Sequence, residues 1–396
     1  MTTTATPMAN LPAICVKLDL IRSELGAYFF ERESLIDLIF VSLLARQHMV
    51  VYGPPGTGKS DLLRSAMSHI VGARTFLKLM TKTTVPDETE GAIDVPLMMQ
   101  TGEYRRRRAG KLTDCEVAFL DEVFKANSMI LNTMLMNMNE REYEEEGTLH
   151  RIPLISLFGA SNELPESKEL LAFADRFIFK YETRYLTPAN RSKLHRRPSG
   201  TKYAPTTFLD LSELQLLQSL VGQVTFPDPV NVQYDAVLQA AEDAGLQISD
   251  RAVMQAKTIM AASAVLNGRD VAAFEDVELL EHVLWREPKD KTAVKAIVGR
   301  VVNPLKARAN ELIDQAATVY DGLRPLFNQA ATTESKKKAM EASAKLTNVM
   351  DDIRTEQANN PGANLTPLDK ALERVEVLSE NVVNWMMGRR ERIKEV

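Results

Sequence analysis

A stretch of eight residues early in the chain restricts the possible folds more than any other feature of this sequence. The stretch lies between an apolar run that ends at Tyr52 and a helical pattern that begins at Asp61. Its glycines tolerate the backbone angles that turn N–H groups inward around phosphate oxygens, and the following helix directs the positive end of its dipole at the same oxygens. The sequence therefore predicts a phosphate-binding loop formed by Gly53, Pro54, Pro55, Gly56, Thr57, Gly58, Lys59 and Ser60.

The spacing G-x-x-x-x-G-K-S assigns chemistry to individual residues of this loop. Lys59 is expected to reach the β- and γ-phosphate oxygens of a nucleotide as a point charge, and the Ser60 hydroxyl is expected to be a ligand of Mg²⁺. Asp61, at the start of the helix, completes the expected nucleotide-binding set. An apolar strand precedes the loop and a second predicted strand, Thr75–Met80, follows the helix, so the loop lies in the strand-helix-strand context that it requires.

Two carboxylates follow the apolar run at residues 117–120. A run that is apolar at every position is typical of a strand buried on both faces of a parallel sheet, where ligands bind beyond the carboxyl edge. Asp121 is suited to the Mg²⁺ shell, and Glu122 is suited to accepting a proton from the attacking water or to orienting it. By itself the pair is equally compatible with a helix N-cap, and the phosphate loop upstream favours the catalytic interpretation.

A third apolar run, residues 154–160, delivers Asn162 to the same edge of the predicted sheet. A side-chain amide at this position is suited to hold the nucleophilic water and a γ-phosphate oxygen at once. Tyr28 and Phe29 begin the segment Tyr28–Arg32, which lies before the first core strand. In nucleotide-binding domains of this layout that segment touches the base, so these aromatic residues either border the base or belong to the core, and both interpretations stay open.

Composition and charge narrow the class of protein. A chain of 396 residues is too long for one core and suggests two or three domains. The net charge of −5 argues against a protein whose main task is to coat nucleic acid. The longest apolar run, Leu35–Ala45, is far shorter than the ~20 residues that cross a bilayer, so no membrane insertion is expected. The small number of cysteines and the lack of a secretory signal pattern favour the cytoplasm.

Changes in apolar periodicity divide the chain into parts. Within the nucleotide-binding part, residues 86–108 predict an inserted helix plus a hairpin, and Glu142–Ile152 predicts a second hairpin. Ser249 or Asp250 is expected to cap a helix that carries Arg251 in its first turn. The expected parts are a disordered tail at 1–10, an α/β core at 11–185, a linker at 186–205, an all-helical region at 206–288 and three helical segments, packed as a bundle, at 289–396.

The combination of GPPGTGKS, FLDE, ASN and DRF, with an inserted helix and hairpin before FLDE and a hairpin before ASN, resembles the AAA+ ATPases of the MoxR family. Short matches resemble the RavA-like branch of that family; they are KLMT at 78–81, NELP at 162–165, ISDR at 248–251, NGRD at 267–270 and VLW at 283–285. The resemblance covers residues 11–287, and the C-terminal helices are similar more loosely. RavA-type proteins carry a compact β-rich insert in these helices. The breaks at 321–335 and 358–367 are too short to hold it, so partner contacts of that insert are not carried over.

The resemblance implies an AAA+ module, in which the α/β core is followed by an all-α lid and then by a C-terminal three-helix domain. It implies ATP and Mg²⁺ as cofactors. It also implies roles for single residues: Asp121 and Glu122 form Walker B after the Walker A loop, Asn162 is sensor 1, Arg251 is sensor 2, and Arg176 is the finger supplied to a neighbouring subunit. Arg141 and Arg151 are the next candidates for this finger.

By this resemblance the chain is expected to hydrolyse ATP in a hexameric ring and to remodel a protein target, together with a partner that contains a von Willebrand factor A (VWA) domain. Two other functions stay open: a scaffold switched by nucleotide with slow hydrolysis, and a motor on DNA, which the acidic net charge disfavours. The run Arg105–Arg108 is expected to line the ring's pore or a subunit contact, or to lie on a solvated hairpin face.

Overall fold

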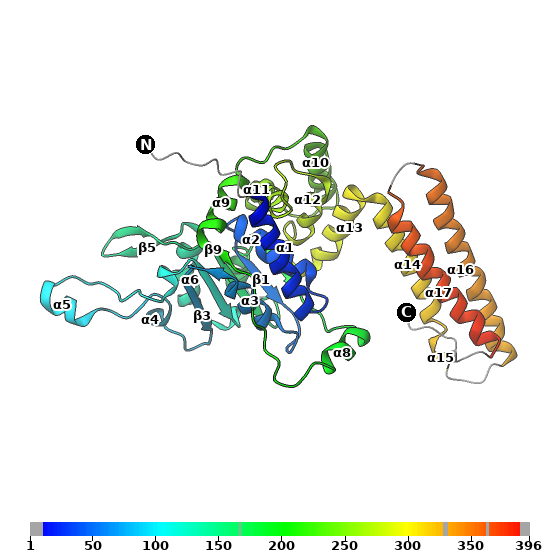
Figure 1. Cartoon of the computed structure of the whole chain (residues 1–396), viewed down its shortest axis with the longest axis horizontal. Helices are drawn as coiled ribbons and strands as arrows, with labels where there is room; N and C mark the ends of the chain where they lie inside the picture. The colour runs from blue at the N-terminus through cyan, green and yellow to red at the C-terminus, as the bar shows by residue number, and fades with distance from the viewer. Residues whose placement is uncertain (1–10, 166–167, 328–331, 362–363, 389–396) are drawn as a thin grey trace. The chain divides into compact units, whose positions relative to one another are not determined.

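The computed structural model describes residues 11–165, 168–327, 332–361 and 364–388, and the tail expected at residues 1–10 lies outside them. The chain divides into two compact units, residues 1–291 and 292–396. Among the described residues, all strands lie in the first unit, whereas the regular elements of the second are helices (Figure 1).

A five-stranded parallel sheet forms the centre of the first unit, in the order β3-β4-β7-β1-β8. In the register of the sheet, Tyr52 lies beside Ser161 and Glu182, and Leu79 lies beside Asp121. The strands therefore end at a common carboxyl edge, as the apolar runs predicted. The strands are β1 (Met49–Tyr52), β3 (Thr75–Leu79), β4 (Val117–Asp121), β7 (Ser156–Ser161) and β8 (Phe179–Glu182).

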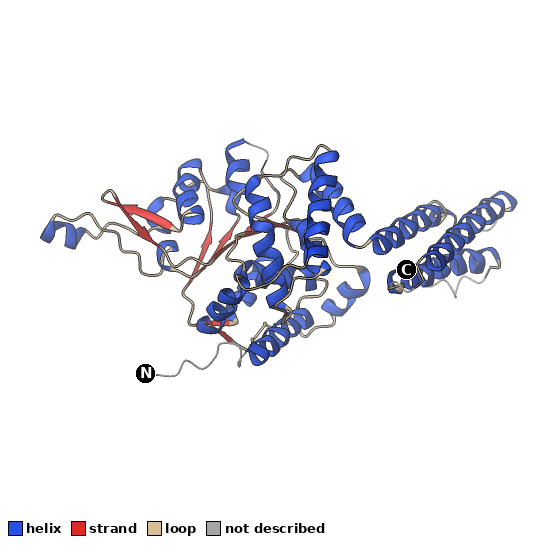
Figure 2. Ribbon diagram, turned by 90° about the horizontal axis from the view of Figure 1, so that it is seen from above, coloured by secondary structure: helices blue, strands red, loops and turns tan. Residues whose placement is uncertain are grey.

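Helices cover both faces of this sheet (Figure 2). Alternate residues of β4 face opposite sides: the Phe119 ring lies under Arg64 of α3, whereas Ala118 and Leu120 belong to the core cluster formed with α6 and α7. Helix α2 is buried at nearly every position, because its sequence is apolar almost all round. The covering helices are α1 (Leu11–Tyr28), α2 (Glu33–Leu44), α3 (Lys59–Ser68), α6 (Ser128–Asn139) and α7 (Lys168–Ala174).

A mainly helical region follows the sheet, where the sequence predicts an all-helical lid; the structure adds one short strand at its start. Its central helix α11 packs on α2 and α9. The predicted cap is present, since the Ser249 hydroxyl accepts a hydrogen bond from the Ala252 N–H and α11 begins at Asp250. The elements of this region are β9 (Leu209–Asp210), which pairs with β2 (Ile70–Val71), α9 (Leu211–Val221), α10 (Asp228–Asp243), α11 (Asp250–Leu266) and α12 (Phe274–Glu278).

The segment at 86–108 differs from the predicted helix plus hairpin. It contains two short helices, α4 (Pro86–Thr89) and α5 (Val95–Thr101), and its two arms meet in a single antiparallel bridge between Ile93 and Arg106. The second predicted hairpin is present as β5 (Glu142–Glu145) and β6 (Thr148–Arg151). Figure 1 shows α5 and this hairpin extending in the same direction from the sheet.

Two of the four consecutive arginines fasten this segment to the hairpin. The Arg106 guanidinium donates to Asp87, and its backbone N–H donates to the Glu145 carboxylate. The Arg108 guanidinium lies over the ring of Tyr143, 4.3 Å from its centre. The other two arginines also pair within the chain, Arg105 with Glu103 (2.9 Å) and Arg107 with Asp94 (3.0 Å), but their side chains are exposed. The run is therefore solvated in part, and its place in a pore or a subunit contact stays a prediction.

The region from 186 to 205 lacks apolar periodicity, and the sequence predicts a linker there. The structure adds a short helix within it, α8 (Pro188–His195), which the sequence analysis did not predict. Proline at the first turn suits a helix start, since its missing N–H would be unsatisfied there in any case. The helix has no buried residue, which is why apolar periodicity did not reveal it.

Three long helices pack together in the second unit, as predicted. Their contacts form one apolar cluster that includes Leu312, Leu346, Val375 and Trp385. The first predicted segment is broken at Asn303, whose side chain caps a new helix beginning at Pro304. The elements are α13 (Lys291–Val302), α14 (Pro304–Asp321), α15 (Arg324–Phe327), α16 (Thr333–Asn359) and α17 (Thr366–Met386). Among the described residues, no helix is long and apolar enough to span a membrane.

A buried histidine predicts how the stability of the first unit depends on pH. His48 lies directly before β1, accepts the Leu157 N–H at Nδ1 and contacts the Met138 carbonyl through Nε2. Burial lowers its pKa to about 4, and the positive charges of Arg141 and Arg251 act in the same direction. Because this pKa lies below the value of ~6.5 in the unfolded chain, stability is full above pH ~6.5 and is lost as the pH falls towards 4.

We expect the free energy of unfolding to fall by about 2 kcal/mol between pH 7 and pH 5 through His48 alone. Urea unfolding followed by circular dichroism at both pH values measures this loss. The variant His48→Gln should be less stable at pH 7 but should lack this part of the pH dependence. An unchanged difference between the two pH values in His48→Gln would contradict the assignment.

Candidate functional site

The phosphate loop leaves β1 at a point where only glycine fits. Gly53 has a φ of +140°, and a Cβ placed there would lie 2.3 Å from the carbonyl oxygen of Thr183, the residue that directly follows β8. Gly56 and Gly58 both have a φ of +77°, in the left-handed region. Gly58 directly precedes α3, so the loop passes into the positive end of this helix.

Lys59 lies at the centre of the loop and is only 7% exposed. Its ammonium group donates to the carbonyl oxygens of Gly53 (2.7 Å) and Pro54 (3.0 Å) and to Oδ1 of Asn162 (3.3 Å). Burial lowers the pKa of Lys59, and the charges of Glu122 and Asp121 oppose this effect. A lysine held against the loop by neutral acceptors is well placed for phosphate oxygens, which accept stronger, charge-assisted hydrogen bonds.

Asp121 ends β4 on the side of α3. One of its oxygens accepts the N–H of Glu122, and the other lies 3.8 Å from Nη2 of Arg64. Arg64 follows Ser60 by four residues in α3, so the two share one face of that helix. Asp121 therefore faces the side of α3 that carries the Ser60 hydroxyl. The sequence prediction did not include Arg64.

The oxygens of Ser60 and Asp121 fit Mg²⁺, which prefers oxygen ligands and usually takes only one or two of them from the protein. Across the described ranges, no group of three or more His, Cys, Asp or Glu residues could hold a metal with protein ligands alone. Phosphate oxygens and water would complete the coordination shell, as they do in nucleotide sites.

Glu122 is held beside the loop by two partners. The Asn162 amide donates to its Oε1 (2.9 Å), and the Lys125 ammonium lies 3.4 Å from its Oε2. A continuous line of polar contacts thus runs from Lys59 through Asn162 to Glu122. The structure brings together the four predicted residues Lys59, Asp121, Glu122 and Asn162. Such a carboxylate and amide can orient a water molecule and accept its proton.

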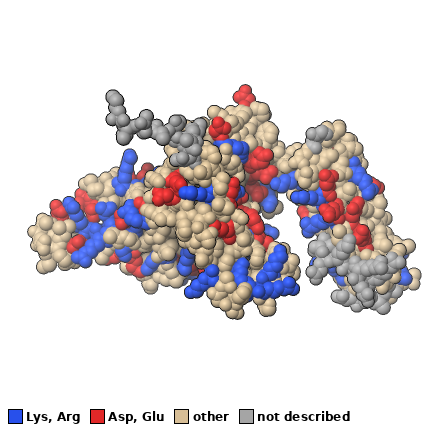
Figure 3. Space-filling model, in the orientation of Figure 1, with Lys and Arg blue, Asp and Glu red and all other residues tan. Residues whose placement is uncertain are grey.

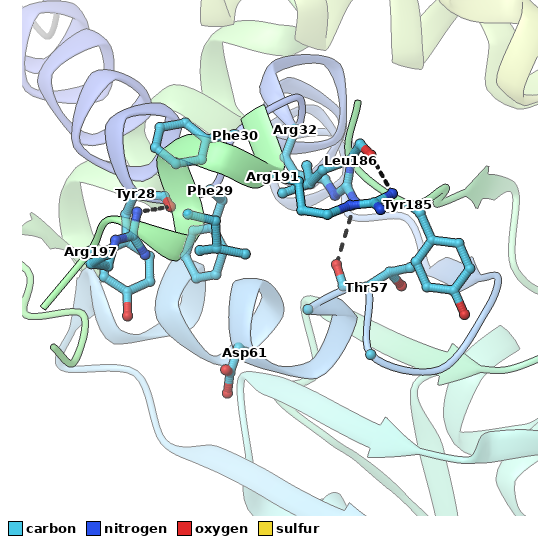
Figure 4. A pocket seen from close by; sticks show the side chains of 13 residues that line it. Tyr28, Phe29, Phe30, Arg32, Thr57, Asp61, Tyr185, Leu186, Arg191 and Arg197 are labelled. Atoms are coloured by element: carbon cyan, nitrogen blue, oxygen red, sulfur yellow. Dashed lines mark hydrogen bonds between the residues drawn. The ribbon is translucent and has the colours of Figure 1, made fainter. Parts of the chain in front are cut away.

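A cavity of about 580 Å³ lies beside the loop (Figure 4). Tyr28 and Phe29 line it and are half-buried, so they form its wall and are not core residues. Asp61 lines it from the first turn of α3. The volume and the aromatic wall suit a small planar ligand. The lining residues are Tyr28, Phe29, Phe30, Arg32, Gly56, Thr57, Gly58, Asp61, Tyr185, Leu186, Arg191, Leu194 and Arg197.

The outer wall of this cavity is supplied by α8, which the sequence analysis missed. Arg197 lies over the ring of Tyr28 at 3.9 Å and donates to the Tyr28 carbonyl (2.7 Å). At the other end, Glu31 accepts hydrogen bonds from the Thr187 N–H (3.1 Å) and from the Asn190 amide (2.7 Å). Burial raises the pKa of Glu31, but these hydrogen bonds outweigh it and hold the pKa below its usual value.

Arg176 and Arg251 lie at the opposite edge of the sheet. Arg176 precedes β8 and so lies at the amino end of that strand. Nη1 of Arg251 donates to the Asn139 side chain (2.8 Å), and Arg251 is close to His48, which precedes the amino end of β1. The two arginines are near each other, and Arg176 has its pKa lowered by burial and by the charge of Arg251. The structure therefore does not bring the expected sensor 2 residue, Arg251, to the phosphate loop of its own chain.

The other two finger candidates differ from each other. Arg141 is half-buried and donates to the carbonyl oxygen of Leu154 (2.9 Å) and to that of Arg46, so it is committed to contacts within the chain. Arg151 ends β6 and is exposed.

Comparison with known proteins gives two family matches along this chain. Residues 16–206 match the family model described as the MoxR domain in MoxR-vWA-beta-propeller ternary systems, and residues 233–298 match an AAA lid domain. An uncharacterised protein of Methanocaldococcus jannaschii is 38% identical over 304 residues, which cover 76% of this chain and 78% of that protein. Chaperone MoxR1 of Mycobacterium tuberculosis is 24% identical over 206 residues, 48% of this chain and 50% of its own.

A crystal structure of a "putative ATPase" from Cytophaga hutchinsonii superposes with a TM-score of 0.60 at 15% identity, over 74% of this chain and 96% of that one. This likeness concerns the fold. Together with the phosphate loop, the acids after β4 and the lid, the fold defines an AAA+ ATPase. The chain belongs to the MoxR family of these ATPases. The RavA-like branch stays a prediction.

The close approach of Gly53 to Thr183 predicts unequal effects of two alanine substitutions. In Gly56→Ala the new Cβ meets no atom within 4 Å, so only the left-handed backbone costs free energy, about 1 kcal/mol. In Gly53→Ala the Cβ would also collide with a backbone carbonyl, and we expect a loss at least twice as large. Thermal unfolding without nucleotide measures both. Equal losses would contradict the packing described at Gly53.

Proposed function

We propose that this protein hydrolyses ATP with Mg²⁺ in the cytoplasm. The main support is the line of hydrogen bonds that joins Lys59, Asn162 and Glu122 beside the phosphate loop. Lys59 binds the β- and γ-phosphate oxygens, and the N–H groups of residues 53–60 surround them. Asn162 holds the attacking water against the γ-phosphate, and Glu122 accepts its proton. Bound Mg²⁺, held by Ser60 and through Asp121, would neutralise phosphate charge.

In this proposal the base of ATP lies in the cavity beside the loop. The half-buried rings of Tyr28 and Phe29 provide a planar apolar wall, and Asp61 lies at the boundary with the loop. The cavity opens next to Gly56, Thr57 and Gly58, so a nucleotide can place its base there and its phosphates in the loop.

We further propose that Arg176 and Arg251 act on the nucleotide of a neighbouring copy in a ring of six. Both lie at the far edge of the sheet from their own loop, and Nε of Arg176 has no hydrogen-bond partner among the described residues. An arginine supplied by a second copy stabilises the charge that develops on the transferred phosphoryl group.

The target of the ring is a protein, in our proposal, and its recognition involves a partner with a VWA domain. The support is the family: the matching model is described from MoxR-vWA-beta-propeller systems, and the relative in Mycobacterium tuberculosis is described as a chaperone.

Mixing two inactive variants tests the action of Arg176 on a neighbouring copy. Arg176→Ala should lower ATP turnover by about 10³–10⁵-fold and leave ADP affinity within a few fold, because the residue lies outside its own nucleotide site. Glu122→Gln should also be inactive. A mixture of the two should regain turnover, measured by phosphate release, because some sites then combine an intact Glu122 with an intact neighbouring Arg176.

The control for this mixture is the double variant Glu122→Gln/Arg176→Ala mixed with Arg176→Ala, which offers no intact arginine and should stay inactive. Parental turnover by Arg176→Ala alone would remove this residue from catalysis, and Arg151→Ala would be measured next.

The same Glu122→Gln variant should bind ATP but should not hydrolyse it, because the glutamine amide cannot accept the proton of the attacking water. We expect turnover to fall at least ~10²-fold while ATP affinity is retained. Equilibrium binding of a fluorescent ATP analogue and phosphate release measure the two quantities. A ring stalled in this way should retain a VWA-domain protein from the native host in the presence of ATP, and Lys59→Ala, which lacks the phosphate contact, should not. Retention that is equal in both variants would contradict an ATP-dependent partner.

A further inference from the structure

A buried cation in the wall of the cavity is used by none of the roles above. Arg32 is 8% exposed, and it lines the cavity together with Gly56, Thr57 and Gly58 of the phosphate loop. Figure 4 shows its side chain reaching toward Thr57, with Phe29 and Phe30 on one side. Arg32 therefore lies where the aromatic wall meets the phosphate loop.

Among the described residues, the hydrogen bonds of this guanidinium go to backbone carbonyl oxygens alone. Nη1 donates to Glu31 (2.9 Å), and Nη2 donates to Arg184 (2.7 Å) and, more weakly, to Thr57 (3.4 Å). The carboxylate of Glu31, the neighbour of Arg32 in sequence, accepts hydrogen bonds from Thr187 and Asn190, and the charge of Arg32 acts on it only at longer range, where it helps to lower its pKa. A guanidinium has five N–H donors, so these three bonds leave two donors available to a ligand.

A buried charge without an ionic hydrogen-bond partner costs free energy, because carbonyl dipoles compensate it only in part. An anion in the cavity would reduce this cost, and a phosphate group matches the planar fork of an arginine. The other cavity arginines are placed differently. Arg197 lies on the Tyr28 ring, and Arg191 is exposed and donates to the Leu186 carbonyl.

We propose that Arg32 binds the α-phosphate of the nucleotide held by its own chain. Lys59 is held by Gly53, Pro54 and Asn162, on the side of the loop where the β- and γ-phosphates are expected. Arg32 lies at the other side, between the loop and the aromatic wall. The α-phosphate is the phosphate bonded to the ribose, and it is therefore the one nearest to the base. This inference rests on the proposed function, since it takes a nucleotide as the ligand.

Titration calorimetry with adenosine, AMP and ADP, without Mg²⁺, separates this role from others. Arg32→Gln should weaken AMP and ADP binding about 10–100-fold, which is the loss expected for a charged hydrogen bond, and should leave adenosine binding within about threefold. Arg32→Lys keeps the charge but not the fork, so its loss should be smaller and again confined to the phosphorylated ligands. Arg196→Gln, an exposed arginine outside the cavity, is the matched control and should bind all three like the parent.

Three outcomes would overturn the inference or its basis. Equal AMP affinity in Arg32→Gln and the parent excludes the phosphate contact. An equal loss of adenosine and AMP binding means that Arg32 only shapes the wall. Should Arg32→Gln melt below the assay temperature, Arg32→Lys decides by the same comparison. If the parent itself does not bind ADP, the proposed ATPase function fails, and the inference fails with it.

Discussion

The parallel pairing of β1 with β7 and β8 is the constraint on which the rest of the structure depends. Tyr52 lies between Ser161 and Glu182 in this register, so the residues that follow, Gly53, Asn162 and Thr183, leave the sheet side by side. A shift by one residue would reverse the faces of a whole strand and would separate Lys59 from Asn162. The geometry of the candidate site is thus a consequence of sheet register, and the loop residues only complete it.

The core of the site could be predicted because its signals are local. The run Val117–Leu120 is apolar at every position and is followed directly by two acids. Such a pattern is typical of a strand that is buried on both faces. The phosphate loop has a fixed spacing, and the apolar run before Asn162 marks a third strand. Strands that are connected through helices run parallel and have their carboxyl ends at the same edge of the sheet. The meeting of these residues therefore follows from the order of the elements along the chain.

The rest depends on contacts between distant residues that leave no periodic trace. Helix α8 buries no side chain and is held by polar contacts such as those of Glu31 with Thr187 and Asn190, so its sequence resembles a linker. The sequence placed Arg251 correctly in the first turn of α11. It did not reveal which edge of the sheet that turn approaches, because the position of α11 is set by its packing on α2. Arg64 was missed for the same reason, and Arg32 was expected only as part of the segment 28–32 near the base, without a contact of its own.

In our proposal one chain is an incomplete catalyst, because Arg176 and Arg251 lie at the edge of the sheet opposite to the phosphate loop with Lys59. Strand β1 has four residues and therefore spans about 13 Å, which is the length of sheet between the phosphate loop and the arginines near the strand's amino end. In the proposed ring a second copy would bring the pair to the site, by placing its far edge against the loop of the first. The two surfaces in such a contact would differ, so the interface would be head-to-tail and would leave a free loop at one end and a free pair of arginines at the other. A contact of this kind continues until rotation closes it into a ring, and closure would then give every loop its arginines.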